Sequence, residues 1–110
     1  MTERAIDIIA FKAAKDAGQV PLLVDVRSVE EFEAGHVAGA LNLPLAELAA
    51  SIHRLDDYEG QELYLICRSG IRSATACTFL ASEGHRATNV LGGTLAWQAQ
   101  GWPTLKGSSP

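Results

Sequence analysis

The sequence predicts a single-domain α/β fold with a central, mostly parallel sheet and helices on both faces. Helical patterns alternate with short apolar runs along the chain, which is typical of α/β proteins. The runs are continuously apolar rather than alternating, as expected for strands that are covered on both faces. Polar residues follow two of these runs directly. In parallel sheets ligands bind at the carboxyl ends of strands, so these residues mark the expected functional edge.

Each predicted element follows from the local pattern. The helical patterns span residues 7–18, 28–35, 45–55, 72–84 and 92–101. The strand patterns span residues 22–26, 39–44, 62–67 and 87–91. We expect one domain over residues 1–106 and a disordered tail over residues 107–110, where the sequence is Gly-Ser-Ser-Pro.

Capping signals set the limits of two of these helices. Asp7 is a candidate N-cap, and Gly18 lies just beyond the end of the first helix. The second helix begins with a capping box, in which Ser28 is the N-cap and Glu31 stands three residues later. Gly35 marks the exit of this helix.

Composition and charge exclude several classes of function. The chain has 110 residues and a formal net charge of -4, with scattered Lys and Arg, so no nucleic-acid partner is predicted. No apolar stretch is long enough to cross a bilayer, and the charged N-terminal residues lack the apolar core of a secretory signal. We therefore expect no membrane partner and a cytoplasmic location, where thiols stay reduced. The two cysteines lack a C-x-x-C spacing, so no metal site is predicted.

The segment Cys67–Arg72, with the sequence CRSGIR, carries the strongest chemical signal. Cys67 ends a buried strand and a helix follows, so the first N–H groups of this helix point back at the loop. A loop that includes Gly70 can turn its own N–H groups inward and form a nest for an anion. A helix N-terminus lowers a thiol pKa by roughly one unit. Loop N–H groups together with Arg68 and Arg72 must supply the further lowering that a thiolate at neutral pH requires.

A buried cysteine is more often an inert small apolar residue, and Cys77 fits that description because it lies inside a helical pattern. Cys67 differs because it opens a loop that contains Gly, Ser and Arg. Cysteine enzymes that transfer phosphate share a C-x5-R signature, whereas Arg72 follows Cys67 after four residues and Ser73 stands where that arginine would be. The shorter loop makes a tighter nest, which suits one additional sulfur atom better than a phosphoryl group.

Three segments resemble the rhodanese family, and specifically its single-domain sulfurtransferases. They are DVRSVEEFEAGHVAGALNLP, YLICRSGIRSATACTFLASEGH and VLGGTLAWQAQGWP, which appear in the family's order and extend from about Pro21 to Pro103. The resemblance implies that Cys67 is the nucleophile of a ping-pong sulfur transfer. Its thiolate would take the sulfane sulfur of thiosulfate or a persulfide donor and hold it as a persulfide. Cyanide or a thiol would then accept the sulfur, without a metal or an organic cofactor.

The resemblance also assigns roles to the residues around Cys67. Arg68, Ser69, Gly70, Ile71 and Arg72 would form the loop that binds the substrate, with Ser73 in support. Asp25 and Arg27 match a D-x-R element near this loop, for which we expect an ion pair or hydrogen bonds that brace it. Alternatively, Arg27 pairs at the surface with Glu30 or Glu31.

Other functions remain open at this stage. The domain could be a sulfur carrier that delivers the persulfide to a protein partner, with the same chemistry and a different acceptor. A phosphatase or an arsenate reductase on the same scaffold is a further alternative. The short loop disfavours a phosphatase. The distance between Cys67 and Cys77, which lies farther along the helix, disfavours an arsenate reductase.

Overall fold

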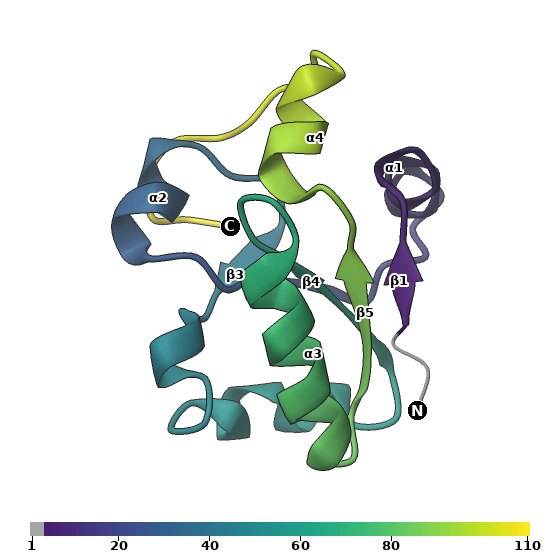
Figure 1. Cartoon of the computed structure of the whole chain (residues 1–110), viewed down its shortest axis with the longest axis vertical. Helices are drawn as coiled ribbons and strands as arrows, with labels where there is room; N and C mark the ends of the chain where they lie inside the picture. Colours follow the sequence, from purple (N-terminus) through teal and green to yellow (C-terminus); the bar gives the residue numbers. More distant parts are fainter. Residues whose placement is uncertain (1–3) are drawn as a thin grey trace.

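A computed structural model describes residues 4–110 and contains one five-stranded sheet in the order β1-β5-β4-β2-β3 (Figure 1). The strands are β1 (Ala5–Ile6), β2 (Leu22–Asp25), β3 (Ala40–Asn42), β4 (Glu62–Ile66) and β5 (Arg86–Val90). Every neighbouring pair is parallel. In the central pair Asp25 lies opposite Ile66, so β2 and β4 end at the same level. The residues after these two strands therefore share one edge of the sheet.

Helices connect the strands, as the alternating pattern predicts. They are α1 (Ile8–Asp16), α2 (Val29–Ala34), α3 (Ile71–Ser82) and α4 (Gly93–Ala99). The predicted caps are confirmed. Asp7 accepts a hydrogen bond from the Ala10 N–H at 2.8 Å, and Ser28 and Glu31 form the complete capping box. These two caps satisfy backbone N–H groups that would otherwise lack partners at the starts of α1 and α2.

The sheet carries an apolar core on each face, so the prediction of helices on both faces is confirmed. On one face, side chains of β2 and β4 pack against α3 and the segment between β3 and β4, through Leu48, Leu55 and Leu80. On the other face α1, α2 and α4 contribute Phe11, Phe32 and Trp97. Burial on both faces explains why the strands read as continuous apolar runs.

The structure differs from the prediction in two elements. Residues 45–55 were expected to form one helix, but the chain forms two 3₁₀ segments, η1 (Leu45–Glu47) and η2 (Ile52–Tyr58). Leu48 and Leu55 are both fully buried, so packing against the sheet sets the path of this connection. The edge strand β1 was missed because two residues are too short to show a periodicity.

The C-terminal segment lies along α2. His36 and Leu105 form an antiparallel bridge, and the Gly107 N–H donates to the carbonyl of Glu33 at 2.9 Å. The domain limit at residue 106 and the disorder of residues 107–110 stay predictions. In residues 4–110, none of the helices combines the length and the apolar character needed to span a membrane.

Candidate active site

The loop after β4 places Cys67 at the carboxyl edge of the sheet. Gly70 is the N-cap of α3 and has a φ of 105°, a backbone conformation that glycine adopts without strain. This turn folds the loop back over the strand end, so that the Gly70 N–H donates to Cys67 Sγ at 3.1 Å. The structure thus forms the nest of N–H groups that the sequence predicts around the sulfur.

The Cys67 side chain is buried, with a residue exposure of 1%, and its sulfur accepts hydrogen bonds on several sides. Besides Gly70, the Ser73 hydroxyl lies 3.2 Å from Sγ. Burial by itself raises the pKa of the Cys67 thiol. Hydrogen bonds from the Ser73 side chain and from the backbone N–H groups of residues 73, 70 and 69 outweigh burial and lower this pKa below its ordinary value. The lowered pKa increases the fraction of the thiolate, the form in which cysteine is a nucleophile.

Ser73 also contacts a residue of β5 that the sequence analysis did not select. Its Oγ lies 2.6 Å from Asn89 Oδ1, and both residues are buried. The Asn89 Nδ2 donates to the carbonyl of Gly70 at 3.0 Å. Asn89 thus joins the loop at Gly70 to the hydroxyl that faces the sulfur.

The first turn of α4 holds the backbone of the same loop. The carbonyl of Cys67 accepts hydrogen bonds from the Thr94 N–H at 2.9 Å and from the Thr94 hydroxyl at 3.1 Å. The Leu95 N–H donates to the carbonyl of Arg68 at 3.0 Å. A Cβ added at Gly93 would lie only 2.3 Å from the Cys67 oxygen, so this close approach requires glycine.

The two arginines of the loop are placed differently. Arg72 forms a bidentate ion pair with Glu31 of α2, with Nη1–Oε1 and Nη2–Oε2 distances of 2.7 and 2.8 Å. The hydrogen bonds to Glu31, and to a smaller degree the charge of Cys67, raise the pKa of Arg72. The Arg68 side chain is exposed. Burial opposes the ionisation of Cys67, hydrogen bonds from residues 73, 70 and 69 lower its pKa, and the charge interaction with Arg72 also favours the thiolate.

Asp25 and Arg27 form a buried ion pair next to the loop. Arg27 Nε and Nη2 donate to the Asp25 carboxylate at 2.8 to 3.1 Å, and Nη2 also donates to the carbonyl of Gly35 at 2.9 Å. The alternative in which Arg27 pairs with Glu30 or Glu31 is therefore wrong. The contacts of the pair extend to the end of α2, and its support of the Cys67 loop stays a prediction.

Comparison with known proteins agrees with this arrangement. Residues 9–100 match the model of the rhodanese-like domain. YtwF of Bacillus subtilis, provisionally named a sulfurtransferase, is 32% identical over 94% of this chain and 98% of its own length. YrkF of the same organism, provisionally named a sulfur carrier protein, is 34% identical over 84% of this chain and 49% of its own length. The crystal structure of a rhodanese-related protein from Thermoplasma volcanium has a TM-score of 0.83 and 29% identity, and the match covers 93% and 97% of the two chains.

The chain belongs to the rhodanese family. The resemblance noted in the three sequence segments is thereby confirmed, and so is the α/β fold. The roles of the individual loop residues in this member stay predictions, because they rest on the geometry above. Among residues 4–110 the structure has no cluster of three or more His, Cys, Asp and Glu side chains that could hold a metal ion.

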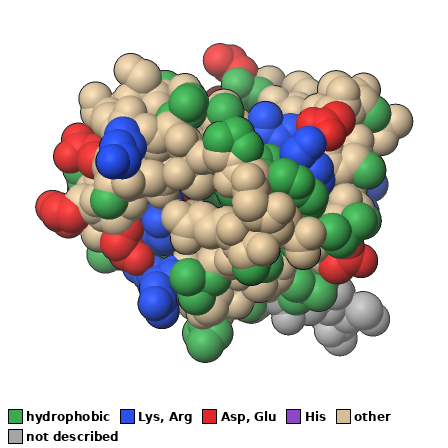
Figure 2. All heavy atoms as spheres, turned by 90° about the horizontal axis from the view of Figure 1, so that it is seen from above, with side chains coloured by type: hydrophobic (Ala, Val, Ile, Leu, Met, Phe, Trp, Pro, Cys, Tyr) green, Lys and Arg blue, Asp and Glu red, His purple; other side chains and the backbone are tan. Residues whose placement is uncertain are grey.

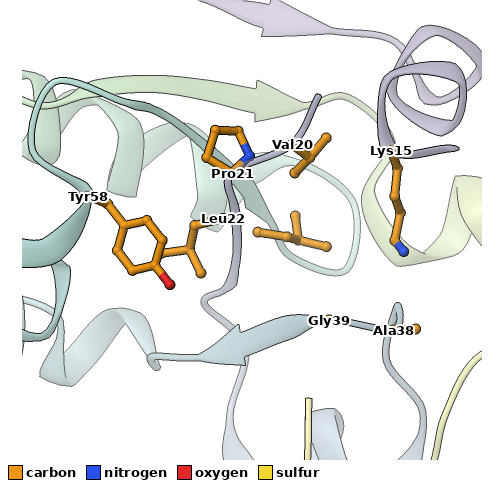
Figure 3. A pocket seen from close by; sticks show the side chains of 8 residues that line it. Lys15, Val20, Pro21, Leu22, Ala38, Gly39 and Tyr58 are labelled. Carbon is orange, nitrogen blue, oxygen red and sulfur yellow. The ribbon is translucent and has the colours of Figure 1, made fainter. Parts of the chain in front are cut away.

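Two of the cavities of this rhodanese domain lie at opposite ends of the sheet. One of about 350 Å³ adjoins the active-site loop, and its mostly apolar wall is formed by Val26, Ser28, Pro44, Leu45, Ala46 and Arg72. The other, of about 280 Å³, opens at the amino end of β2 between Lys15 and Tyr58 (Figure 3). Because β2 and β4 are parallel, this second cavity lies at the edge of the sheet opposite Cys67. Of these two, the first is the one that adjoins the Cys67 loop and could receive a molecule that reacts there.

The surface is mixed in charge. Seen from above, Lys and Arg side chains stand beside Asp and Glu side chains, and hydrophobic side chains reach the surface between them (Figure 2). Ile71 of the active-site loop is 76% exposed, and Leu91 and Leu95 near it are also exposed.

Sequence reasoning missed three contributors to the site, namely Asn89, Thr94 and the pairing role of Glu31. Asn89 carried a usable signal, since it is a polar residue inside a buried strand and lies opposite Leu65 of β4. Thr94 lies inside the helical pattern of residues 92–101, which gave no indication of its contact with Cys67. The pairing of Glu31 with Arg72 spans 41 residues and left no local signal.

Proposed function

We propose that this protein is a sulfurtransferase that carries a sulfane sulfur on Cys67. Membership of the rhodanese family and relatives named for sulfur transfer support this general activity. The observation that carries the proposal is the buried Cys67 sulfur, which accepts hydrogen bonds from the Gly70 N–H and the Ser73 hydroxyl. Such donors stabilise a thiolate, and they equally stabilise the anion of a persulfide.

In the first half of the reaction the Cys67 thiolate attacks the outer sulfur of thiosulfate. The new S–S bond forms as the S–S bond of thiosulfate breaks, and sulfite leaves with the electron pair of that bond. Cys67 then holds a persulfide anion. Loop N–H groups and the exposed Arg68 are placed to bind the anionic donor and the departing sulfite.

In the second half an acceptor nucleophile attacks the terminal sulfur of the persulfide. Cyanide gives thiocyanate and a thiolate gives a new persulfide, and in both cases the Cys67 thiolate is restored. The apolar cavity beside Arg72 offers room for the organic part of a thiol acceptor. We place the reaction in the cytoplasm, where Cys67 stays reduced.

A second candidate is a sulfur carrier that passes the persulfide to a protein. The relative YrkF favours it, because its provisional name is that of a sulfur carrier protein and this chain matches about half of its length. The two functions share the chemistry at Cys67 and differ in the acceptor.

The deciding experiment is intact-mass spectrometry of the protein after incubation with thiosulfate, beside a Cys67→Ser variant. We expect the wild type to gain one sulfur atom, and cyanide to remove it as thiocyanate in a stoichiometric amount. The variant should gain none and should lose turnover by more than about a thousandfold. A Cys77→Ser variant is the matched control, and we expect it to behave as the wild type.

Other results would change the assignment in defined ways. A sulfur gain only with a persulfide donor would keep the mechanism and replace thiosulfate. Sulfur that leaves with a protein thiol but not with cyanide or a small thiol would favour the carrier. Hydrolysis of an aryl phosphate without any gain of sulfur would move the protein to the phosphatase alternative.

A further inference from the structure

The Ser73 hydroxyl has one proton and two acceptors within reach. Cys67 Sγ lies 3.2 Å from its oxygen and Asn89 Oδ1 lies 2.6 Å away. All three residues are buried, with exposures of 0% to 2%. Burial limits the access of water molecules that could donate a second hydrogen bond. The single hydroxyl proton can bond only one of the two acceptors at a time.

The orientation of the Asn89 amide is fixed by its other end. Its Nδ2 donates to the carbonyl of Gly70 at 3.0 Å, a group that cannot act as a donor. The amide oxygen must therefore face Ser73, where it can only accept. A reversed amide would place its NH₂ group against the hydroxyl and its oxygen against the Gly70 oxygen, which is repulsive.

We propose that Asn89 is a positioning residue that sets the direction of the Ser73 hydroxyl proton and thereby controls how readily Cys67 ionises. When Cys67 is a thiol, its S–H donates to Ser73 Oγ while the hydroxyl donates to Asn89. When Cys67 loses its proton to solvent, the sulfur can only accept, and the hydroxyl proton turns from Asn89 to the sulfur. Ionisation thus costs the protein the hydrogen bond between Ser73 and Asn89.

The consequence is a tuned nucleophile. The same serine that stabilises the thiolate is partly held by Asn89, so the thiolate is less stable than the loop alone would make it. Low-pKa thiolates are weaker nucleophiles, and the best attacking thiol has a pKa near the ambient pH. The inference rests on the proposed function for the role of Cys67 as the nucleophile, but the ionisation of Cys67 can be measured without any sulfur donor.

The charged groups near Cys67 are few and belong to other segments. Arg72 of α3 interacts electrostatically with Cys67, and Asp25 acts in turn on Arg72. Arg68 follows Cys67 directly, and Arg27 is paired with Asp25. Residues 87–95, which include the end of β5 and the first turn of α4, contain no charged side chain. A substitution at Asn89 by an uncharged residue therefore leaves the local charges unchanged.

The test is the rate of alkylation of Cys67 by iodoacetamide as a function of pH, in a Cys77→Ser background. Leucine has the same branched arrangement of side-chain heavy atoms as asparagine, with a larger volume, and offers no acceptor. We expect Asn89→Leu to lower the midpoint of the profile by about 0.5 to 1 pH unit, because the hydroxyl is then free for the sulfur. Ser73→Ala should raise the midpoint. In the double variant, the change at residue 89 should shift the midpoint no further than Ser73→Ala alone.

This cycle separates positioning from a merely structural role. A downward shift that persists in the Ser73→Ala background, or an upward shift in either background, would overturn the proposal, since Asn89 would then act through Gly70 and the loop. Asn89→Ala is made in parallel, in case leucine does not fit within β5, and thermal unfolding checks that each variant is folded. The wild type supplies an independent measurement by NMR. The side-chain amide resonance of Asn89 should titrate with the alkylation midpoint, and a constant resonance would refute the coupling.

The outcome is independent of the sulfur donor. If no donor transfers sulfur to Cys67 but the alkylation cycle behaves as expected, the proposed function fails and the role of Asn89 stands. If sulfur transfer occurs and the cycle shows no coupling, the reverse holds.

Discussion

The ends of β2 and β4 lie next to each other in the sheet, but their polar groups differ. At the end of β2 opposite charges pair with each other, and after β4 hydrogen-bond donors surround one sulfur atom. At the end of β2, the Asp25 carboxylate accepts hydrogen bonds from three groups of Arg27, namely its backbone N–H, Nε and Nη2. Asn42 donates to the carbonyls of Asp25 and Arg27 at 3.0 Å. Positive and negative charge cancel inside this cluster of Asp25, Arg27 and Asn42, which we call the closed cluster.

After β4, the loop gathers donors around a single sulfur atom. The Gly70 N–H and the Ser73 hydroxyl point at Cys67 Sγ, and against the effect of burial such hydrogen bonds lower the pKa of the thiol. A persulfide or a substrate anion can use the same donors. The two adjacent strand ends therefore differ in role. The closed cluster after β2 stabilises the fold, and the loop after β4 has hydrogen-bond donors available for chemistry.

Removing one charge from the closed cluster should have the largest effect on stability. Asp25→Asn leaves the buried Arg27 guanidinium without a counter-charge, and breaking a buried ion pair in this way costs about 3 to 5 kcal/mol. Urea unfolding at neutral pH measures the difference. Asp16→Asn is the control, because it breaks the exposed pair with Lys12, which is worth less than about 1 kcal/mol. Equal losses in the two variants would contradict the structural role given to Asp25.

The loop at the end of β4 should be most sensitive to its contact with α4. In Gly93→Ala the new Cβ would meet the oxygens of Cys67 and Arg68 at 2.3 and 2.7 Å, and backbone atoms cannot move aside without shifting the loop. We expect sulfur transfer to fall by about a hundredfold, the effect of a misplacement near 1 Å. Steady-state assays with thiosulfate and cyanide measure it.

Gly101→Ala is the matched control for this prediction. Gly101 also has a positive φ, of 80°, but open space surrounds the position of its Cβ. Both variants therefore carry backbone strain, and only Gly93→Ala presses on the loop. A similar activity in the two variants would show that α4 does not hold the Cys67 loop in place.

A smaller effect is expected from removing one donor of the loop. Ser73→Ala takes away the hydroxyl that lies 3.2 Å from Cys67 Sγ and leaves the backbone donors in place. The pKa of Cys67 should rise, so the thiolate fraction and the activity at neutral pH should fall by about 3-fold to 10-fold. Ser82→Ala on the same helix is the control, because that hydroxyl bonds only the carbonyl of Phe79 at the surface. Activity of Ser73→Ala that rises to the wild-type level at higher pH would support this reason, and a loss independent of pH would argue against it.

The sequence was sufficient for the fold because the fold leaves local signals, and the choice of Cys67 as the proposed nucleophile rests on a local signal as well. Continuous apolar runs predicted the buried strands, and the Ser28–Glu31 box predicted the start of α2. Cys67 was recognisable from its place at a strand end before a loop that contains Gly70. In each case the pattern lies within a few residues and the physical cause is equally local.

The remaining features depend on contacts between distant segments. The guanidinium of Arg72 pairs with Glu31, which is 41 residues away and gave no local signal, while the expected support of the thiolate by Arg72 stays a prediction. Asn89 reaches Ser73 and Gly70 only because β5 lies beside β4 in the sheet. The helix expected over residues 45–55 was wrong because burial of Leu48 and Leu55 overrides local helix propensity. Such pairings require the topology, which a single sequence does not contain.

The ion pair between Glu31 and Arg72 links the two regions compared above, and it should have the smallest effect and a defined pH dependence. Hydrogen bonds from Arg72 lower the pKa of Glu31 from 4.5 to about 2. A carboxyl whose pKa is lowered by folding stabilises the protein above its unfolded value, and this contribution is lost as the pH falls from 4.5 to about 2. Both side chains are about one-third exposed, so solvent screening reduces the contribution to about 1 kcal/mol at neutral pH.

Glu31→Gln is the variant that isolates this pair, because glutamine can still accept the hydrogen bond of the capping box from Ser28. We expect the difference in unfolding free energy between wild type and variant to be about 1 kcal/mol at neutral pH. It should shrink at high salt and approach zero only below pH 2, where Glu31 is protonated in both states. Urea unfolding across this pH range measures it. A difference that stays constant with pH would mean that the charge of Glu31 does not stabilise the protein through its pair with Arg72.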